Sequence, residues 1–357
     1  MKHKTLKTAV RSVLLSVLIY VILSFLVVMI LYESLFSRKE IYEHSVYLTY
    51  VDISLPYREI NFDSDGFRLY GRIYNEDGKE GTVILGHGKD GSGEDLLAET
   101  CFFAENGFTV LIFDLTGHGK SEGTTQRGLC RAAADMESAV LFCENDEQLS
   151  QKPIFLYGFG VSGYGAALCS SRNSVKAVVA VSAFSDVPKM TLEDACSNMG
   201  VLGYLEYPIM LLYQYILFGD DLGRSAIDVI NASDTPVLAI HGTSDETVSF
   251  SGAALSACKA KITGTNFQTL TVEGGKHYGI LRSEEAAAYL DSYNDAAYEL
   301  FRQYNGEVPA YLINQLYEQY DREKMSELNA EIMQQIVLFY KNSREVIYGD
   351  PTYFTQG

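Results

Sequence analysis

Leu156-Tyr-Gly-Phe-Gly-Val-Ser-Gly-Tyr-Gly165 is the stretch that most restricts the fold of this chain. The apolar run Ile154–Tyr157 precedes its glycines and predicts a buried strand. Gly163–Ser171 follows and predicts a helix, so the glycines between them must form a tight turn from strand into helix. Such a turn lies at the carboxyl end of a strand, which is where open α/β sheets collect their functional residues.

The same pattern of strand, loop and helix repeats on both sides of this turn. Short apolar runs predict four further buried parallel strands, at Thr82–Leu85, Thr109–Phe113, Ala177–Val181 and Val237–Ile240. Amphipathic stretches predict helices at Asp95–Asn106 and Arg131–Asn145. Arg58–Tyr74 alternates around the turn Asp63-Ser-Asp-Gly66 and predicts a hairpin. The predicted fold class is therefore α/β, with a doubly wound, mostly parallel sheet.

Two helical regions interrupt or extend this pattern. Between Phe184 and Asp234 the alternation stops, and Met199–Phe218 is rich in Leu, Tyr, Ile and Met. We expect a helical insertion at about 185–233, which either forms a lid over an apolar site or packs between helices. From Ser283 onward we expect three helices, near 283–304, 308–320 and 322–341. They form a C-terminal extension of a domain that spans 58–345, and 346–357 is left as a tail.

The N-terminal segment predicts a membrane helix. Ser12 to Tyr32 is uncharged and apolar, and a spanning helix needs about 20 such residues. Basic residues precede it and only mixed charge follows, so we expect a signal anchor at 12–32 with residues 1–11 in the cytoplasm. A connector at 33–57 then leads to an extracytoplasmic domain of a single-pass protein in the cell membrane. A cleaved signal peptide and a buried core helix are the alternatives.

Composition narrows the classes of partner. The formal charge of −18 argues against nucleic acid, whose phosphates favour basic surfaces. The six cysteines are scattered, without C-x-x-C pairs or Cys/His pairs at zinc spacing. We therefore predict no metal site, no cofactor and no disulfide framework. The oligomeric state stays open.

The loops after the predicted strands carry the residues with chemical function. Gly86-His-Gly-Lys89 follows one strand, and Asp114-Leu-Thr-Gly-His-Gly-Lys-Ser121 follows the next. Asp245 comes just after the strand at Val237–Ile240, and His277 lies in a glycine-flanked loop some 30 residues later. An imidazole that acts as a general base needs a carboxylate to hold its tautomer. We therefore predict that Asp245 and His277 form an acid–base pair.

These motifs, in this order, resemble the α/β-hydrolase superfamily from about residue 58 to about 341. The chain is similar to membrane-anchored bacterial hydrolases related to serine aminopeptidases, esterases and monoacylglycerol lipases. The resemblance implies an oxyanion loop at Gly86-His-Gly88, with backbone N–H donors from Lys89 and from Val161 or Gly163. It also implies an acid at Asp245, a base at His277, and an ester, thioester or small amide as substrate. A lipid-like ester is one such substrate.

The chain departs from this family at its opening stretch. Family members run Pro-x-x-x-x-Gly-His-Ser-x-Gly-Gly, with the nucleophile seven residues after the proline. The same count from Pro153 ends on Gly160, and Ser162 comes two residues later. The positions two before and two after the turn's apex must be small, because strand and helix nearly touch there. An apex at 162 would place Tyr164 at a crowded position, so sterics favour Gly160 as the apex.

Three functional hypotheses follow. An active serine hydrolase would use Ser162 through a distorted turn, with His277 as base and Asp245 as its orienting partner. A pseudohydrolase would keep the fold and the lid as a binding or sensing module, because Gly160 occupies the nucleophile position. A nucleotide-binding domain would use Gly158-x-Gly-x-x-Gly163. That fingerprint normally opens the first βαβ unit of a domain, whereas several strands come first in this chain.

Overall fold

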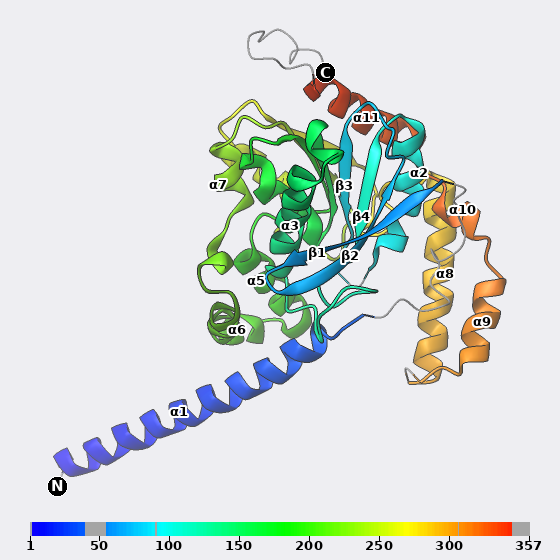
Figure 1. The fold of residues 1–357 in the computed structure, drawn as a ribbon. Coiled ribbons are helices and arrows are strands. Elements are labelled where there is room, and N and C mark those ends of the chain that lie inside the picture. Colours follow the sequence, from blue (N-terminus) through cyan, green and yellow to red (C-terminus); the bar gives the residue numbers. More distant parts are fainter. Residues whose placement is uncertain (1, 40–54, 90, 306, 345–357) are drawn as a thin grey trace.

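The structure is a computed structural model of the chain, and it describes residues 2–39, 55–89, 91–305 and 307–344. The predicted connector at 33–57 falls mostly outside these residues, and the predicted tail at 346–357 falls entirely outside them. Within the described residues, one eight-stranded sheet runs in the order β1-β2-β4-β3-β5-β6-β7-β8 (Figure 1). Its strands are β1 (Tyr57–Ser64), β2 (Phe67–Tyr74), β3 (Thr82–Gly86), β4 (Thr109–Phe113), β5 (Ile154–Phe159), β6 (Val175–Val181), β7 (Val237–Gly242) and β8 (Phe267–Val272).

The sheet is mixed but mostly parallel. Strands β3 to β8 pair in parallel, and β2 is antiparallel to both β1 and β4. The predicted hairpin is confirmed as β1–β2, in full register from Tyr57–Tyr74 to Ser64–Phe67. Its turn residues Asp65 and Gly66 both have positive φ (46° and 82°), as the tightest hairpin turns require. The five predicted parallel strands are confirmed, with ends that differ by at most two residues.

Strand β8 is the strand that the sequence pattern did not reveal. It lies at the edge of the sheet next to β7, and most of its residues are only partly buried or exposed. A strand with a half-exposed edge has no continuous apolar run, which was the signal used for the other strands.

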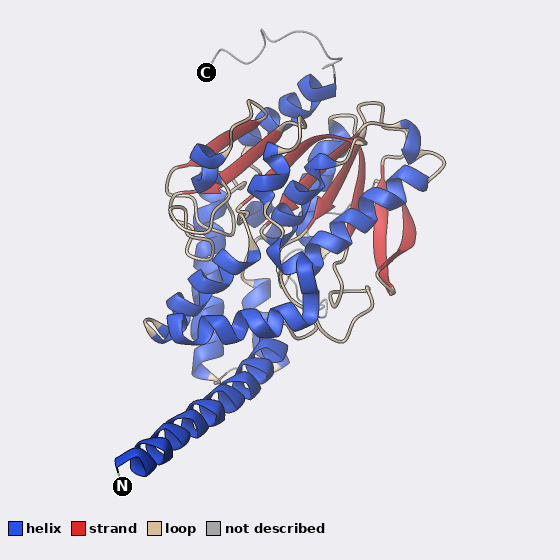
Figure 2. Cartoon of the chain, turned by 90° about the vertical axis from the view of Figure 1, so that its left-hand side faces the viewer, coloured by secondary structure: helices blue, strands red, loops and turns tan. Residues whose placement is uncertain are grey.

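Helices lie on both faces of the sheet (Figure 2). Ile84 faces the hydrophobic core that contains residues of α3 and α4, whereas Val83 and Leu85 face the core that contains residues of α2 and α11. The alternation follows from the two-residue period of a strand. The helices are α1 (Lys2–Leu35), α2 (Leu97–Glu105), α3 (Arg131–Asn145), α4 (Val161–Leu168), α5 (Val187–Met199), α6 (Leu202–Phe218), α7 (Ala226–Asn231), α8 (Glu284–Gln303), α9 (Ala310–Glu318), α10 (Arg322–Ser326) and α11 (Ala330–Arg344).

The two helical regions expected from the sequence differ in how they are built. Helices α5 to α7 connect β6 to β7, in the range expected for an insertion. The last predicted helix, at 322–341, is divided into α10 and α11. The helix is interrupted at residues 327–329 because Glu327 and Asn329 form backbone hydrogen bonds with Ser283 and Leu281 instead.

Helix α1 projects from the domain (Figure 1). Within its Ala9–Leu35 part, the most apolar 18 residues have a mean hydropathy of 3.1 and are 11% buried, so by length and composition the helix can cross a membrane. Signal peptides have the same composition. The part nearest the domain is packed, because Val28, Tyr32 and the following Phe36 belong to the main hydrophobic core.

Candidate active site

Gly160 forms the apex of the turn between β5 and α4. Its φ of 56° and ψ of −114° lie where glycine is favoured and other residues are strained. A Cβ atom at this position would lie 3.6 Å from His277 Nε2 and 3.8 Å from the Cα of Gly88, both ordinary van der Waals distances. There is therefore room for a side chain at 160, and that side chain would point at the imidazole.

Close packing explains the other glycines of this turn. A Cβ on Gly158 would overlap the carbonyl oxygen of Ser162, and one on Gly163 would lie 2.8 Å from the Cβ of Ala183. Strand and helix approach so closely that neither position accepts a side chain. These two positions of the G-x-G-x-x-G pattern are accounted for by packing alone. Tyr164 lies away from the apex, stacked on Phe184 with ring centroids 4.8 Å apart.

Ser162 is fully buried in the first turn of α4. Its Oγ donates a hydrogen bond to the carbonyl oxygen of His87 (2.6 Å), and it lies against Gly86 at the end of β3. Among the described residues no hydrogen bond joins Ser162 to His277. The Ser162 hydroxyl is thus hydrogen-bonded to the loop after β3, and Gly160 is the residue that faces the imidazole of His277.

The structure brings Asp245 and His277 together at the carboxyl ends of β7 and β8. His277 Nδ1 lies 2.8 Å from Asp245 Oδ2 and 3.0 Å from Oδ1, and both side chains are buried. Asp245 Oδ1 also accepts hydrogen bonds from the backbone N–H groups of Thr247 (2.9 Å) and Val248 (2.8 Å). This carboxylate orients the imidazole so that Nε2 faces Gly160.

The protonation state of Asp245 follows from these contacts. Burial raises the pKa of its carboxyl, but hydrogen bonds from His241, His277 and the Val248 N–H outweigh this and hold the pKa well below its usual range. Asp245 is therefore ionised at neutral pH and can stabilise a proton that His277 takes up.

His241 is a site residue that the sequence reasoning missed. Its Nε2 lies 3.1 Å from Asp245 Oδ2 and 2.9 Å from the Val248 carbonyl oxygen. It lies four residues before Asp245, at the end of β7, and its ring is buried. The signal was in the motif His241-Gly-x-x-Asp245, where only the acid was assigned a role.

The loop after β3 contacts the turn between β5 and α4, where Ser162 binds the His87 carbonyl oxygen. Burial lowers the pKa of His87 to about 4, so its ring is neutral at pH 7. Its Nδ1–H donates to the Gly88 carbonyl oxygen (2.8 Å), and its Nε2 accepts from the N–H of Leu115 (3.0 Å). These bonds fix the loop whose next residue, Lys89, was predicted to supply an oxyanion donor. That role, and those of the N–H groups of Val161 and Gly163, stay predictions.

Comparison with known proteins finds hydrolases with a similar sequence or fold. Residues 77–203 match the family model described as "Serine aminopeptidase, S33". An esterase of Pyrococcus furiosus has a similar structure, with a TM-score of 0.53 and 18% identity over 75% of this chain and 98% of that one.

The chain has the α/β-hydrolase fold, and part of it resembles the serine aminopeptidase family.

The curated relatives share only part of their length with this hydrolase-fold chain. "Thiohydrolase aneE" of Aspergillus aculeatus is 29% identical over 132 residues, which cover 35% of this chain and 41% of the relative. An uncharacterized 31.7 kDa protein in the traX-finO intergenic region of Escherichia coli is 32% identical over 130 residues, which cover 34% and 44%. The matches thus span less than half the length of these two relatives.

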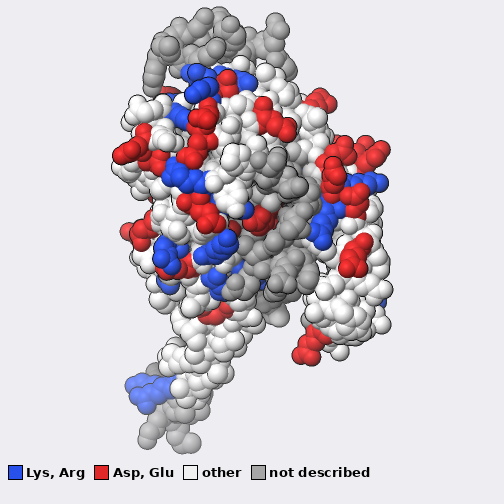
Figure 3. Space-filling view, turned by 45° about the vertical axis from the view of Figure 1, so that its right-hand side comes forward, with Lys and Arg blue, Asp and Glu red and all other residues white. Residues whose placement is uncertain are grey.

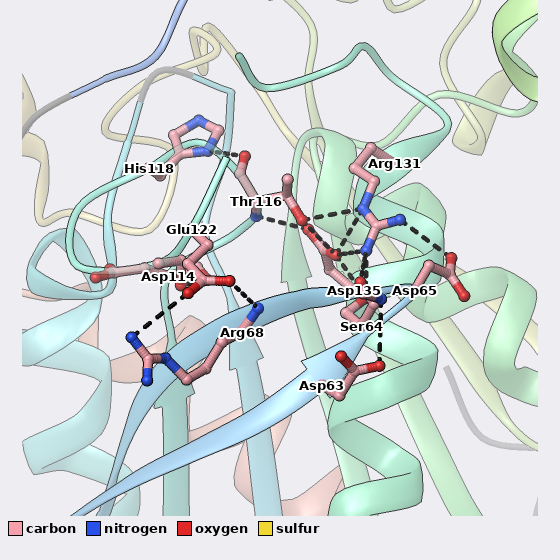
Figure 4. Close-up of polar contacts among 12 residues, drawn as sticks. Asp63, Ser64, Asp65, Arg68, Asp114, Thr116, His118, Glu122, Arg131 and Asp135 are labelled. Carbon is pink, nitrogen blue, oxygen red and sulfur yellow. Dashed lines mark hydrogen bonds and ion pairs between the residues drawn. The ribbon is translucent and has the colours of Figure 1, made fainter. Parts of the chain in front are cut away.

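A buried polar network supports the turn Asp114–Ser121 after β4 (Figure 4). Arg131 Nε donates to Asp135 Oδ1 and to Thr116 Oγ1 (3.0 Å each), and Ser64 Oγ donates to Asp135 Oδ1 (2.8 Å). The network joins the β1–β2 hairpin, the β4 loop and α3. Asp114, at the start of this turn, accepts from the N–H groups of Gly93 and Lys120 (2.9 Å each).

No group of three or more His, Cys, Asp or Glu side chains within 2–39, 55–89, 91–305 and 307–344 could hold a metal ion. The six cysteines are free thiols.

Proposed function

We propose that this protein is a catalytically impaired hydrolase that binds an ester, thioester or small amide and forms no acyl-serine intermediate. Gly160 is the observation that supports this most directly: it occupies the apex in front of His277 and has no side chain. Covalent catalysis needs a nucleophile within hydrogen-bond reach of its base. Ser162 does not meet that condition, because its Oγ donates to the carbonyl oxygen of His87.

The proposed class of ligand follows from the predicted oxyanion donors and from the similar proteins. A carbonyl compound would place its oxygen near the N–H groups of Lys89 and Val161 and its carbon near Gly160. Esters and thioesters are in line with two similar proteins, an esterase with a similar fold and a thiohydrolase with a similar sequence. The insertion α5–α7 between β6 and β7 would act as a lid over this site.

A fluorophosphonate probe tests this proposal, because it bonds covalently to activated serines. The wild-type chain and the Ser162→Ala variant should both remain unlabelled. Labelling of the wild type that disappears in Ser162→Ala would overturn the proposal and establish Ser162 as the nucleophile of an active serine hydrolase.

The retained Asp245–His277 pair favours a second candidate, which is direct hydrolysis by water. His277 Nε2 would take a proton from a water beside Gly160, and the resulting hydroxide would attack the carbonyl carbon. The leaving group would then receive the proton from the imidazolium. Slow turnover of a p-nitrophenyl ester by the wild type, without a burst and abolished by His277→Ala, would support this candidate. Equal rates in both chains would exclude it.

We further propose that α1 is a signal anchor with a cytoplasmic N-terminus. Cleavage would remove Val28 and Tyr32 from the core of the domain, which argues against a cleaved peptide. The basic residues Lys7 and Arg11 flank the apolar span at its N-terminal end. Protease added to intact cells should degrade the domain from outside; protection in intact cells but not in lysed ones would contradict this topology.

A further inference from the structure

Helix α6 consists almost entirely of apolar and aromatic residues. Its 17 residues contain one charged side chain, Glu206, and no Lys, Arg or Asp. A surface helix of a soluble domain normally has one apolar stripe and one polar face, whereas a helix that is apolar all round is buried in a core or lies in a membrane. The buried side chains Ile209 and Tyr213 belong to the main core, so one side of α6 is already accounted for.

The other side of α6 is exposed. Seven large apolar residues, in α6 or just before it, are each at least 48% accessible: Val201, Leu202, Tyr204, Leu205, Leu212, Tyr215 and Ile216. Monomeric proteins rarely leave so continuous an apolar surface in water. We call these seven residues the α6 apolar face.

The Glu206 and Gln214 side chains of α6 are turned away from this face. Glu206 accepts hydrogen bonds from Tyr20 Oη (2.7 Å) and from Ser24 Oγ, both on α1. Gln214 is buried and donates to Thr191 Oγ1 of α5 (3.0 Å). These two side chains therefore have partners within the protein, as the interior of a membrane demands.

The contact with α1 sets how deep α6 would lie. Tyr20 lies 15 residues before Leu35, the end of the candidate span, which is about 22 Å along a helix. The 27-residue span is about 40 Å long, whereas the hydrocarbon of a bilayer is about 30 Å thick. Even if the excess of about 10 Å lay wholly outside at the Leu35 end, Tyr20 would lie about 12 Å inside the hydrocarbon.

Glu206 would then lie at the same depth, because Tyr20 binds it directly. Tyr213, seven residues later in α6, donates to Glu33 (2.7 Å) and contacts the Tyr32 ring, nearer the end of the span. The first half of α6 thus runs beside the middle of α1. In Figure 3 the visible stalk of α1 is mostly uncharged, and basic side chains lie toward its far end.

We propose that α6 lies in the membrane beside α1 and that its apolar face binds the acyl chains of the leaflet next to the domain. This inference rests on the proposed anchoring through α1. It commits the α6 apolar face to lipid rather than to a second copy of the chain, because the face continues the exposed apolar surface of α1 at the same depth. The proposed lid would then be held in the bilayer.

Single tryptophans test the proposal in the full-length chain, which contains none of its own. Tyr204→Trp places the probe on the α6 apolar face, and Tyr311→Trp places it on α9 at nearly equal exposure (65% and 66%). Both variants are reconstituted in phosphatidylcholine vesicles, with and without bromine on the acyl chains. The Tyr204→Trp variant should emit at shorter wavelength than Tyr311→Trp and lose at least half its emission to the brominated lipid. The emission of Tyr311→Trp should not change.

Two further variants distinguish a failure of the α6 inference from a failure of the proposed anchoring. Leu18→Trp reports on α1 itself, and Leu205→Trp replaces Tyr204→Trp if that variant misfolds. Quenching in Leu18→Trp without quenching in Tyr204→Trp would overturn the α6 inference alone. Absence of quenching in both variants would overturn the anchoring as well. Blue-shifted but unquenched emission from Tyr204→Trp would mean that protein covers the face, as in a dimer, and would equally overturn the inference.

Discussion

The loops after β7 and β8 bring Asp245 and His277 into hydrogen-bond contact, whereas the turn after β5 has no side chain at its apex, Gly160. Several hydrogen bonds fix Asp245, from His241, His277 and two backbone N–H groups, and none of them involves the β5–α4 turn. That turn is fixed by the close approach of Gly158 to the backbone of Ser162. The two halves are thus built independently, so one can lose its chemistry while the other keeps it.

The largest expected effect comes from placing a serine hydroxyl at position 160, in front of the Asp245–His277 pair. In a chain with Gly160→Ser, the new hydroxyl would face His277, and Asp245 would orient the base. Adding His277→Ala or Asp245→Asn should then lower kcat/KM for a p-nitrophenyl ester by roughly 1,000- to 10,000-fold. Steady-state assays measure this, with circular dichroism as the folding control. A loss below about tenfold would mean that the pair does not act on position 160.

The next comparison is between two glycines of the same turn. Gly158→Ala should lower the free energy of unfolding by about 3 kcal/mol or prevent folding, because its Cβ would meet the Ser162 carbonyl oxygen. Gly160→Ala should cost only about 1 to 2 kcal/mol, since it has room and only its backbone is strained. Urea unfolding in detergent measures both. Equal losses would contradict the view that only position 160 accepts a side chain.

The pH dependence of the unfolding free energy should report on His87 in the β3 loop. His87 has a pKa lowered by burial to about 4, against about 6.5 when unfolded. Between these values the unfolded chain binds a proton that the folded chain refuses, so stability falls as the pH drops from about 6.5 to 4. The loss should be on the order of 1 to 3 kcal/mol.

The control for this prediction is His87→Gln, which cannot titrate. Burial raises the pKa of Asp95 to about 7 and that of Asp194 to about 6, so both titrate in the same window with the opposite sign. The difference in unfolding free energy between wild type and His87→Gln, measured from pH 7 to 4, isolates the histidine. A difference that does not change with pH would contradict the assignment.

The smallest expected effect is that of Ser162→Ala. This change removes one buried hydrogen bond to the His87 carbonyl oxygen and should cost about 1 kcal/mol of stability. It should leave ester turnover unchanged in both the wild-type and the Gly160→Ser backgrounds. A drop in turnover without a matching loss of stability would give Ser162 a chemical role.

The sequence predicted the parts of the fold that depend on local pattern. Buried strands such as Thr109–Phe113 have continuous apolar runs, and the hairpin turn has its Asp-Gly pair. The motif order also identified the loops that the structure brings together at Asp245 and His277. Each of these signals lies within a few residues of the feature it predicts.

Features that depend on distant contacts were not predictable in this way. Strand β8 has too few buried residues for an apolar run, and the break between α10 and α11 arises from a pairing with Leu281 and Ser283. The contact of His241 with Asp245 depends on how the β7 loop folds back. The contacts between α1 and α6 join residues as far apart in the chain as Tyr20 and Glu206.

The central claim is that Gly160 alone separates this site from a serine hydrolase. Intact-protein mass spectrometry of the wild type and of Gly160→Ser, after exposure to a fluorophosphonate, tests it most directly. The wild type should keep its mass, and Gly160→Ser should gain one phosphonyl group on the introduced serine, which His277→Ala should suppress. A wild-type adduct on Ser162, or a Gly160→Ser chain that folds normally and stays unmodified, would contradict the account.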